Sequence, residues 1–241
     1  AKRQYLQQRL LGRDFVILSE THSSPGTEKA FTAIPGTTSW WSPGTPARAG
    51  VGITVQHAFL DKFRCREPEW IQLDPGRLGV LKLSGTDGDL HIFAAYLPTG
   101  VARELPPEVG PLAAATPGEV AALRTQRRAL CRKLAAALRP ELLAVVAGDW
   151  NFVIALDDRW CKTSGAFSGG ADAAEAAHWK QVMPAGFYEL QQAEFTHDRP
   201  RSRARLDRVF VSQPVSDQLD RRIFAVALQW TGLSQHRPVA F

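Results

Sequence analysis

The chain has 241 residues, of which 44% are hydrophobic and 22% charged, as in a globular protein large enough to bury one sizeable core. Its net charge of +5 is a modest basic excess, and the wide spacing of Cys65, Cys131 and Cys161 excludes a zinc-knuckle pattern and indicates free thiols. The apolar runs are too short to span a bilayer, and the N-terminal residues lack a signal-peptide core, so we expect an intracellular protein that does not associate with membranes.

The N-terminal part of the chain predicts a helix followed by a buried strand. Apolar residues at helical spacing predict a helix over residues 2–11. The apolar run Phe15–Leu18 then predicts a strand, and it ends in the polar sequence Ser19-Glu20-Thr21-His22. Glu20 therefore lies either at the ligand-binding edge of a sheet or simply in the first solvated turn of a loop.

The next segment, Pro35–Pro46, is rich in glycine, proline, serine and threonine, and predicts a loop. It carries the paired aromatic residues Trp40 and Trp41. We expect these side chains to pack against the core, and stacking on nucleic-acid bases is the alternative.

Four short strands are predicted after this loop, over Gly50–Val55, Glu69–Leu73, Leu78–Leu83 and Leu90–Tyr96. The sequence Gly85-Thr86-Asp87-Gly88 predicts the turn between the last two. We expect the four strands to form one antiparallel sheet. The last of them places the hydroxyl group of Tyr96 just before a rigid proline turn.

A long amphipathic helix and a buried strand follow. A segment rich in Pro, Glu and Gly over residues 99–117 predicts a surface loop, apolar positions over Glu119–Leu138 predict the helix, and the run from Leu142 to Asn151 predicts the strand. A helix and a strand after a series of antiparallel strands favour an α+β layered domain over a doubly wound sheet.

The strand that ends in Gly148-Asp149-Trp150-Asn151 has the most informative sequence in the chain. Side chains alternate along a strand, so Asp149 and Asn151 are expected to project to the same side. A carboxylate there can orient a water molecule or bind a cation, and a carboxamide can donate to a phosphate oxygen. The alternative is an ordinary polar turn.

The last third of the chain predicts shorter elements. Asp157-Asp158 predicts an acidic turn, Gly165–Gly170 a loop and Ala171–Met183 a helix, and strands are predicted over Leu206–Val211 and Phe224–Trp230. Five arginines cluster within ten residues, which suits binding to a polyanion: Arg199, Arg201, Arg203, Arg205 and Arg208.

Six polar residues share a position at or beside the end of a predicted strand. They are Glu20, Tyr96, Asp149, Asn151, Asp207 and His236. Each alone has a structural explanation, but together they are suited to form one cleft between two sheets.

The motifs around these residues resemble the endonuclease/exonuclease/phosphatase family in order and spacing over nearly the whole chain. Within that family the sequence is most similar to the apurinic-like endonuclease domain of non-LTR retrotransposons. The motifs are Ser19-Glu20-Thr21-His22, Tyr96-Leu97-Pro98, Gly148-Asp149-Trp150-Asn151, Arg205-Leu206-Asp207-Arg208 and Ser234-Gln235-His236.

The resemblance implies a single domain over residues 1–241 with a four-layered α/β/β/α sandwich of two facing, mostly antiparallel sheets flanked by helices. It also implies that Glu20 ligates a divalent metal, Mg²⁺ or Mn²⁺, which stabilises charge on the phosphate and on the leaving oxygen.

The resemblance implies a role for each of the other strand-end residues. His236 contacts the scissile phosphate or acts as general base, and Asp207 fixes its tautomer. Asp149 orients the attacking water, while Asn151 and Tyr96 donate to phosphate oxygens. The sequence leaves open whether Asp149 or His236 takes the proton.

The resemblance further implies a nucleic-acid partner, with DNA expected and RNA as the alternative. The residues expected to touch its backbone are Thr196, Arg199, Arg201, Arg203 and Arg205. A reverse transcriptase domain or a larger complex would accompany an active retrotransposon endonuclease, which would be nuclear.

Two departures from the family pattern stand out. The final motif of the family is Ser-Asp-His, whereas this chain has the neutral Gln235 at the middle position, so we expect weakened metal affinity and a slower reaction. The chain also begins at the first helix, without the asparagine-bearing strand that normally precedes it, and stops within the last strand; we therefore expect a domain that lacks its first strand and is trimmed at its C-terminus.

These features leave three functional readings. The leading one is a metal-dependent endonuclease that nicks DNA and leaves a 3′ hydroxyl, within a retrotransposon-derived protein. Gln235 and the missing first strand favour a catalytically degenerate member that serves as a structural or nucleic-acid-binding subunit. The third reading, a phosphoinositide or sphingomyelin phosphodiesterase, is disfavoured by the arginine cluster.

Overall fold

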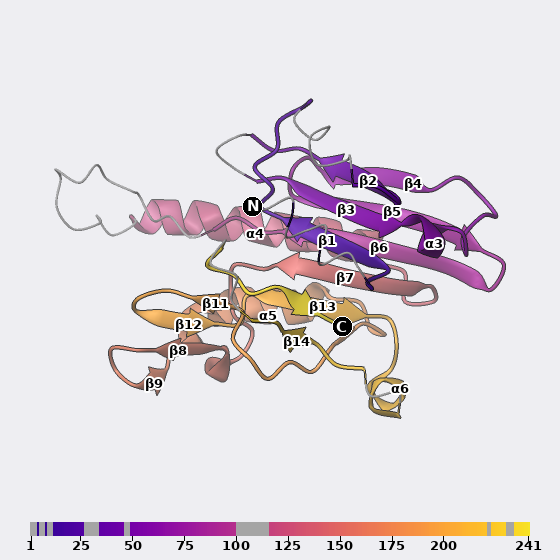
Figure 1. The fold of residues 1–241 in the computed structure, drawn as a ribbon. Coiled ribbons are helices and arrows are strands. Elements are labelled where there is room, and N and C mark those ends of the chain that lie inside the picture. Colours follow the sequence, from indigo (N-terminus) through magenta and orange to yellow (C-terminus); the bar gives the residue numbers. More distant parts are fainter. Residues whose placement is uncertain are drawn as a thin grey trace.

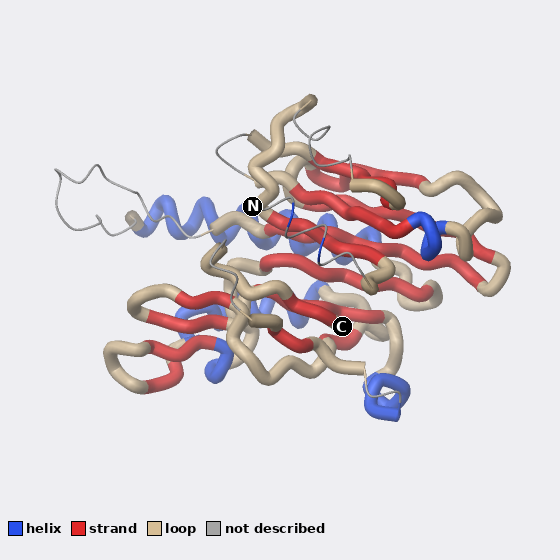
Figure 2. Tube along the Cα trace, in the orientation of Figure 1, coloured by secondary structure: helices blue, strands red, loops and turns tan. Residues whose placement is uncertain are grey.

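Two β-sheets face one another across an apolar core, and helices cover the outer face of the larger sheet (Figures 1 and 2). This computed structural model describes residues 12–26, 34–45, 49–99, 116–220, 223–229 and 234–241, together with positions 4 and 8. The expected α+β sandwich of facing, mostly antiparallel sheets is confirmed. The predicted helix over residues 2–11 and most of the predicted loop over 99–117 lie outside the described residues.

The larger sheet has six strands in the order β10-β13-β7-β6-β5-β4. Only the pairing of β6 with β7 is parallel, and α4 makes the crossover between these two strands. The strands span Glu69–Asp74 (β4), Leu78–Gly85 (β5), Gly88–Tyr96 (β6), Leu143–Asp149 (β7), Tyr188–Glu189 (β10) and Asp207–Val211 (β13).

The smaller sheet has three antiparallel strands in the order β1-β3-β2, which span Phe15–Ser19, Val51–Gln56 and Thr37–Ser42 respectively. Two predictions are corrected here. The strand after Gly50 belongs to this sheet and not to the β4–β6 meander, because the one-turn helix α3 (His57–Leu60) separates it from β4. The predicted loop at Pro35–Pro46 contains β2, which pairs along its whole length with β3.

The two tryptophans of β2 contact other strands of the sandwich. Trp40 packs against the core between the sheets, and a Cβ atom added at Gly52 of β3 would lie 2.5 Å from the ring of Trp41. The expectation of packing against the core is therefore confirmed for Trp40, whereas Trp41 lies over Gly52 of β3. Threonine and tryptophan favour strands, and pairing with β3 along the whole of β2 outweighs the glycine and proline residues that flank it.

The strands of the larger sheet are apolar on both faces. On β7, Val145 and Ala147 face the smaller sheet, whereas Ala144 and Val146 face the helices. This double burial explains why β6 and β7 have continuous apolar sequences rather than alternating ones. It also fixes the direction of each side chain at the strand ends.

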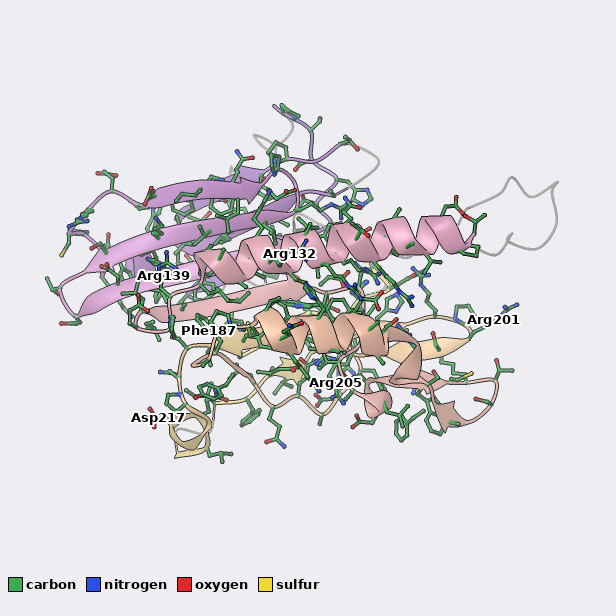
Figure 3. All side chains as sticks on the ribbon, turned by 180° about the vertical axis from the view of Figure 1, so that it is seen from behind. Arg132, Arg139, Phe187, Arg201, Arg205 and Asp217 are labelled. Atoms are coloured by element: carbon green, nitrogen blue, oxygen red, sulfur yellow. The ribbon has the colours of Figure 1, made fainter. Side chains whose placement is uncertain are left out.

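Two helices cover the second face of the larger sheet, as Figure 3 shows from behind. They are α4 (Pro117–Ala137) and α5 (Ala173–Val182). The start of α4 is fixed by a capping box, in which the hydroxyl of Thr116 accepts from the backbone N–H of Glu119 and the Glu119 carboxylate accepts from the N–H of Thr116. Leu130 and Leu134 on its inner face pack with Trp179 of α5.

A separate four-stranded sheet in the order β11-β12-β8-β9 projects beside the sandwich (Figure 1). It was not predicted from the sequence, because each of its strands has only two or three residues. The remaining elements are β8 (Arg159–Cys161), β9 (Ala166–Phe167), β11 (His197–Asp198), β12 (Ser202–Ala204), β14 (Val226–Ala227), β15 (Val239–Ala240), α6 (Val215–Asp220) and the 3₁₀ turns η2 (Leu156–Asp158) and η3 (Gly169–Asp172).

Cys65, Cys131 and Cys161 are all free thiols, as expected. Among the residues that the structure describes, no helix is both long enough and apolar enough to cross a membrane.

Candidate active site at the ends of three adjacent strands

Three of the predicted site residues lie side by side at one edge of the larger sheet, where β6 and β7 end and the antiparallel strand β13 begins. Tyr96 of β6 is in register with Asp149 of β7, and Asp149 is in register with Asp207 of β13. Each continues the row of its strand that faces the smaller sheet, because residues two and four positions away belong to the core between the sheets. The strand pairing therefore brings a phenol and two carboxylates to one edge of the sandwich.

The turn after β7 is tightly constrained. Gly148 has a φ of 154°, and a Cβ atom there would lie 1.8 Å from the carbonyl oxygen of Ala95 on β6. Asn151 has a left-handed φ of 53°, and its backbone N–H and its amide each donate to the carboxylate of Asp149 at 2.8 Å. A non-glycine residue in this conformation persists only where its surroundings fix it, and such residues cluster at functional sites.

The predicted pairing of Asp149 with Asn151 is present, but the amide of Asn151 is already engaged. Its Nδ2 donates to Asp149 and also to the carbonyl oxygen of Leu97, each at 2.8 Å. Both amide hydrogens therefore have acceptors within the protein. The geometry gives Asn151 the role of orienting the Asp149 carboxylate rather than that of a free donor to phosphate.

His236 reaches this edge from the C-terminal segment, which runs beside β11. The residue pairs with His197 in an antiparallel bridge, and the neighbouring Arg237 N–H donates to the carbonyl oxygen of Thr196 at 2.6 Å. The Nδ1 atom of His236 lies 2.8 Å from Asp207 Oδ2, and its Nε2 lies 3.9 Å from Asp149 Oδ2. With Nδ1–H donating to Asp207, Nε2 faces the buried carboxylate.

Glu20 approaches from the smaller sheet, just after β1. Its Oε1 accepts a hydrogen bond of 2.8 Å from the Tyr96 hydroxyl, and the ring of His22 lies 3.4 Å from the same oxygen. Both Glu20 and His22 have left-handed φ values near 50°. The guanidinium of Arg77 stacks 4.8 Å from the centroid of the Tyr96 ring, a contact that the sequence did not suggest.

The burial of these charges shifts their pKa values in opposite directions. Burial, together with repulsion from Asp207, raises the pKa of Asp149 to about 7. Burial alone would lower the pKa of His236, but the attraction and hydrogen bond of Asp207 outweigh it and raise that pKa to about 9. Burial and the hydrogen bond to Glu20 also raise the pKa of Tyr96, so its hydroxyl stays protonated.

Thr196 differs from its expected role. Its side chain is fully buried, and its hydroxyl oxygen accepts from the backbone N–H groups of Leu206 and Asp207 at 3.1 and 3.0 Å. A side chain without exposed surface does not contact a nucleic acid. Thr196 instead fixes the backbone from which Asp207 projects.

The five clustered arginines separate into two groups. Arg205 and Arg208 turn inward to the buried carboxylate of Asp158, the residue that the sequence placed in a solvated acidic turn. Arg203 pairs with Asp198 at 3.1 Å and remains half exposed. Arg199 and Arg201 are exposed, and Figure 3 shows Arg201 at the outer end of the four-stranded sheet that contains β11 and β12.

The sequence matches the endonuclease/exonuclease/phosphatase family over residues 1–221. The chain belongs to this family. A comparison with curated protein sequences found no match.

Several solved structures have the same fold at low sequence identity. An AP endonuclease from Archaeoglobus fulgidus is 17% identical with a TM-score of 0.69, over 98% of this chain and 92% of that one. A 3′-5′ exonuclease from Neisseria meningitidis is 17% identical with a TM-score of 0.62, over 98% and 93%. The endonuclease domain of TRAS1, a telomere-specific non-LTR retrotransposon, is 13% identical with a TM-score of 0.54, over 99% and 89%.

The strand-end residues of this family member fit a divalent cation. Asp149, Asp207 and His236 each offer a ligand atom, and these atoms lie within 4.8 Å of one another. Carboxylate oxygens suit hard cations, and a cation would relieve the repulsion between the two aspartates. Glu20, the expected ligand, is not part of this three-residue group within the described chain, although its charge raises the pKa values of Asp149 and His236.

Arg127 of α4 supports the site from behind and was missed in the sequence, where it looks like one more polar helix residue. Its side chain is 6% exposed; Nε donates to the carbonyl oxygen of Pro98 at 2.9 Å, and Nη2 donates to that of Asn151 at 2.6 Å. Nη1 lies 3.7 Å from the buried carboxylate of Glu175 on α5. One guanidinium therefore joins the segments that follow β6 and β7.

Replacing Arg127 with lysine is expected to lower the free energy of unfolding by about 2 kcal/mol, because a point charge cannot satisfy both carbonyl groups at once. Urea unfolding measures the change. Arg132→Lys, on the exposed side of the same helix, is the matched control and should change stability by less than about 0.5 kcal/mol. Equal stabilities for the two variants would contradict the bridging role.

Proposed function

We propose that the protein is a Mg²⁺-dependent endonuclease that cleaves one phosphodiester bond of DNA and leaves a 3′ hydroxyl. The observation that carries this proposal is the convergence of Asp149, Asp207 and His236 within 4.8 Å at one edge of the sandwich. Membership of the endonuclease/exonuclease/phosphatase family restricts the chemistry to phosphoester cleavage. Mn²⁺ is the alternative cation, since it accepts the same oxygen ligands.

Asp149 is best placed to accept the proton of the attacking water. Burial raises its pKa to about 7, so it is a stronger base than an exposed carboxylate, and Asn151 holds its two oxygens in place. His236 is the complementary cation: Asp207 keeps it protonated and oriented, which leaves Nε2–H free to donate to a phosphate oxygen. We therefore propose that Asp149 rather than His236 takes the proton, the choice that the sequence left open.

The proposed ligand of the cation is Glu20, whose carboxylate accepts a 2.8 Å hydrogen bond from Tyr96 and acts electrostatically on Asp149 and His236. When bound there, Mg²⁺ supplies stabilisation of the negative charge that develops on the phosphate and the leaving oxygen.

DNA is the proposed substrate because of the exposed arginines beside the site and the nature of the related structures. A Neisseria 3′ phosphatase of the same fold was solved bound to a product DNA hairpin. We propose that Arg199, Arg201 and Arg203 contact the nucleic-acid backbone. The motifs shared with retrotransposon endonucleases support an origin beside a reverse transcriptase and a nuclear location, which the adjacent coding sequence and localisation of the tagged protein test.

Gln235 favours a second candidate function. If the aspartate of the family motif is essential, a chain with a neutral residue there would bind nucleic acid without cleaving it, as a structural or nucleic-acid-binding subunit. The two functions differ in one measurable property, namely turnover.

The deciding experiment is the nicking of supercoiled plasmid by the purified protein. We expect relaxed circles in the presence of Mg²⁺ and none in the presence of EDTA, because the converging carboxylates repel one another and the substrate without a cation. Nicking that persists in EDTA would reject the metal-dependent mechanism. DNA binding without any nicking would establish the second candidate instead.

A further inference from the structure

Gln235 contacts an arginine instead of joining the carboxylates of the site. Its Oε1 accepts a hydrogen bond of 3.2 Å from Nε of Arg199, and the same Nε–H lies 3.2 Å from Nε2 of His197. Both acceptors are uncharged, since Gln235 is a neutral amide and the His197 nitrogen that accepts from Arg199 carries no proton. Arg199 is therefore held in place without being neutralised.

Four other cations of this region already have carboxylate partners. Lys162 and Arg203 share Asp198, while Arg205 and Arg208 share Asp158. Arg199 is exposed and, within the part of the chain that the structure describes, has no carboxylate partner and no acceptor for its two Nη groups. A guanidinium with a free pair of parallel donors matches the geometry of a phosphate group.

Arg199 is also close to the candidate active site. The Nε–H of Arg199 donates to the ring of His197, and the centroid of that ring lies 4.6 Å from the centroid of the His236 ring. Strand β11, which ends directly before Arg199, is fixed to the C-terminal segment, because the Asp198 N–H donates to the carbonyl oxygen of Gln235 at 3.2 Å. The unneutralised charge thus lies one side chain away from His236.

We propose that Arg199 binds a nucleic-acid phosphate adjacent to the one that is cleaved, and that Gln235 keeps the charge of Arg199 available for it. This inference rests on the proposed function and deepens it. A carboxylate at position 235 would stand at hydrogen-bond distance from the guanidinium and form an ion pair with it. The neutral side chain of Gln235 holds Arg199 in the same position and leaves its charge to the substrate, so the expected loss of metal affinity is not its main effect.

The test measures binding of a short fluorescent DNA duplex at several salt concentrations in EDTA, where no metal contributes. Gln235→Glu, which changes the charge but barely the shape, is expected to weaken binding roughly tenfold and to reduce the salt slope by about 1, as is Arg199→Gln. Arg64→Gln is the matched control: this exposed arginine is already paired with Asp61 and has no proposed role in binding, so its effect should be less than about threefold.

Binding by Gln235→Glu that equals or exceeds that of the wild type would overturn the proposal. So would binding by Arg199→Gln that matches the binding of the control variant. Thermal unfolding of each variant shows that the protein is folded, as the exposure of both side chains leads us to expect. Failure of the proposed function would look different, since the wild-type protein would then bind DNA but fail to nick plasmid, while the comparison of binding affinities would still decide the role of Arg199.

Discussion

Alanine in place of His236 is expected to reduce Mg²⁺-dependent nicking by about 10³-fold, with the fold unchanged. The imidazole is held by a 2.8 Å hydrogen bond to Asp207, and its Nε2 atom lies 3.9 Å from the carboxylate of Asp149. Truncation removes the donor to the phosphate oxygen and leaves the two aspartates without a cation between them. The rate of plasmid relaxation at saturating Mg²⁺ measures the loss.

Two variants make this prediction specific. Asp207→Asn keeps the size of the side chain but removes the charge that keeps His236 protonated, so its activity should fall to a similar extent. His57→Ala alters an exposed histidine in α3 and should have wild-type activity. If His236→Ala retains more than about a tenth of the wild-type rate, neither of the proposed roles for this side chain is correct.

The second large effect is expected from Gly148→Ala, which should lower the free energy of unfolding by about 3 kcal/mol. A Cβ atom at this position would lie 1.8 Å from the carbonyl oxygen and 2.7 Å from the carbonyl carbon of Ala95, and a φ of 154° is one that few side chains tolerate. The backbone of β6 cannot move aside as a flexible side chain would. Strands β6 and β7 must separate just where they carry Tyr96 and Asp149, so nicking should fall as well.

Urea unfolding followed by tryptophan fluorescence measures the stability change, since Trp150 is fully buried next to this turn. Gly118→Ala is the matched control, because nothing lies within 4 Å of its added Cβ and its position in α4 favours alanine over glycine. A Gly148→Ala protein as stable as the wild type would mean that β6 and β7 are less closely paired than described.

The strand ends were predictable because each apolar run stops abruptly at a polar residue. Glu20, Tyr96 and Asp149 were identified in this way, and the structure places them at one edge of the sandwich. Their alignment was not predictable without the family resemblance, because register between strands far apart in sequence is set by pairing in three dimensions. The same limitation explains why β3 was assigned to the wrong sheet.

Buried charge was the second source of error. The sequence placed Asp158 in an acidic turn and Arg208 in the arginine cluster. Each nevertheless has a relative exposure of 2%, because the two charges form an ion pair inside the protein. Thr196 was similarly taken for a nucleic-acid contact and is a buried backbone acceptor. In each case the decisive partner is many residues distant, so local composition carries no sign of it.

The C-terminal segment that carries His236 is held less firmly than the sheet that carries the other site residues. Asp149 and Tyr96 lie at the ends of the two central strands of a six-stranded sheet that is buried on both faces. His236, in contrast, is carried by a short segment that pairs with two two-residue strands, with β11 through one bridge and with β14 through β15. Local opening of such a segment requires far less free energy than unfolding of the sheet. The protein can therefore lose its histidine to a reversible opening while the sheets stay intact, and resistance to heat or urea does not measure how long the site stays assembled.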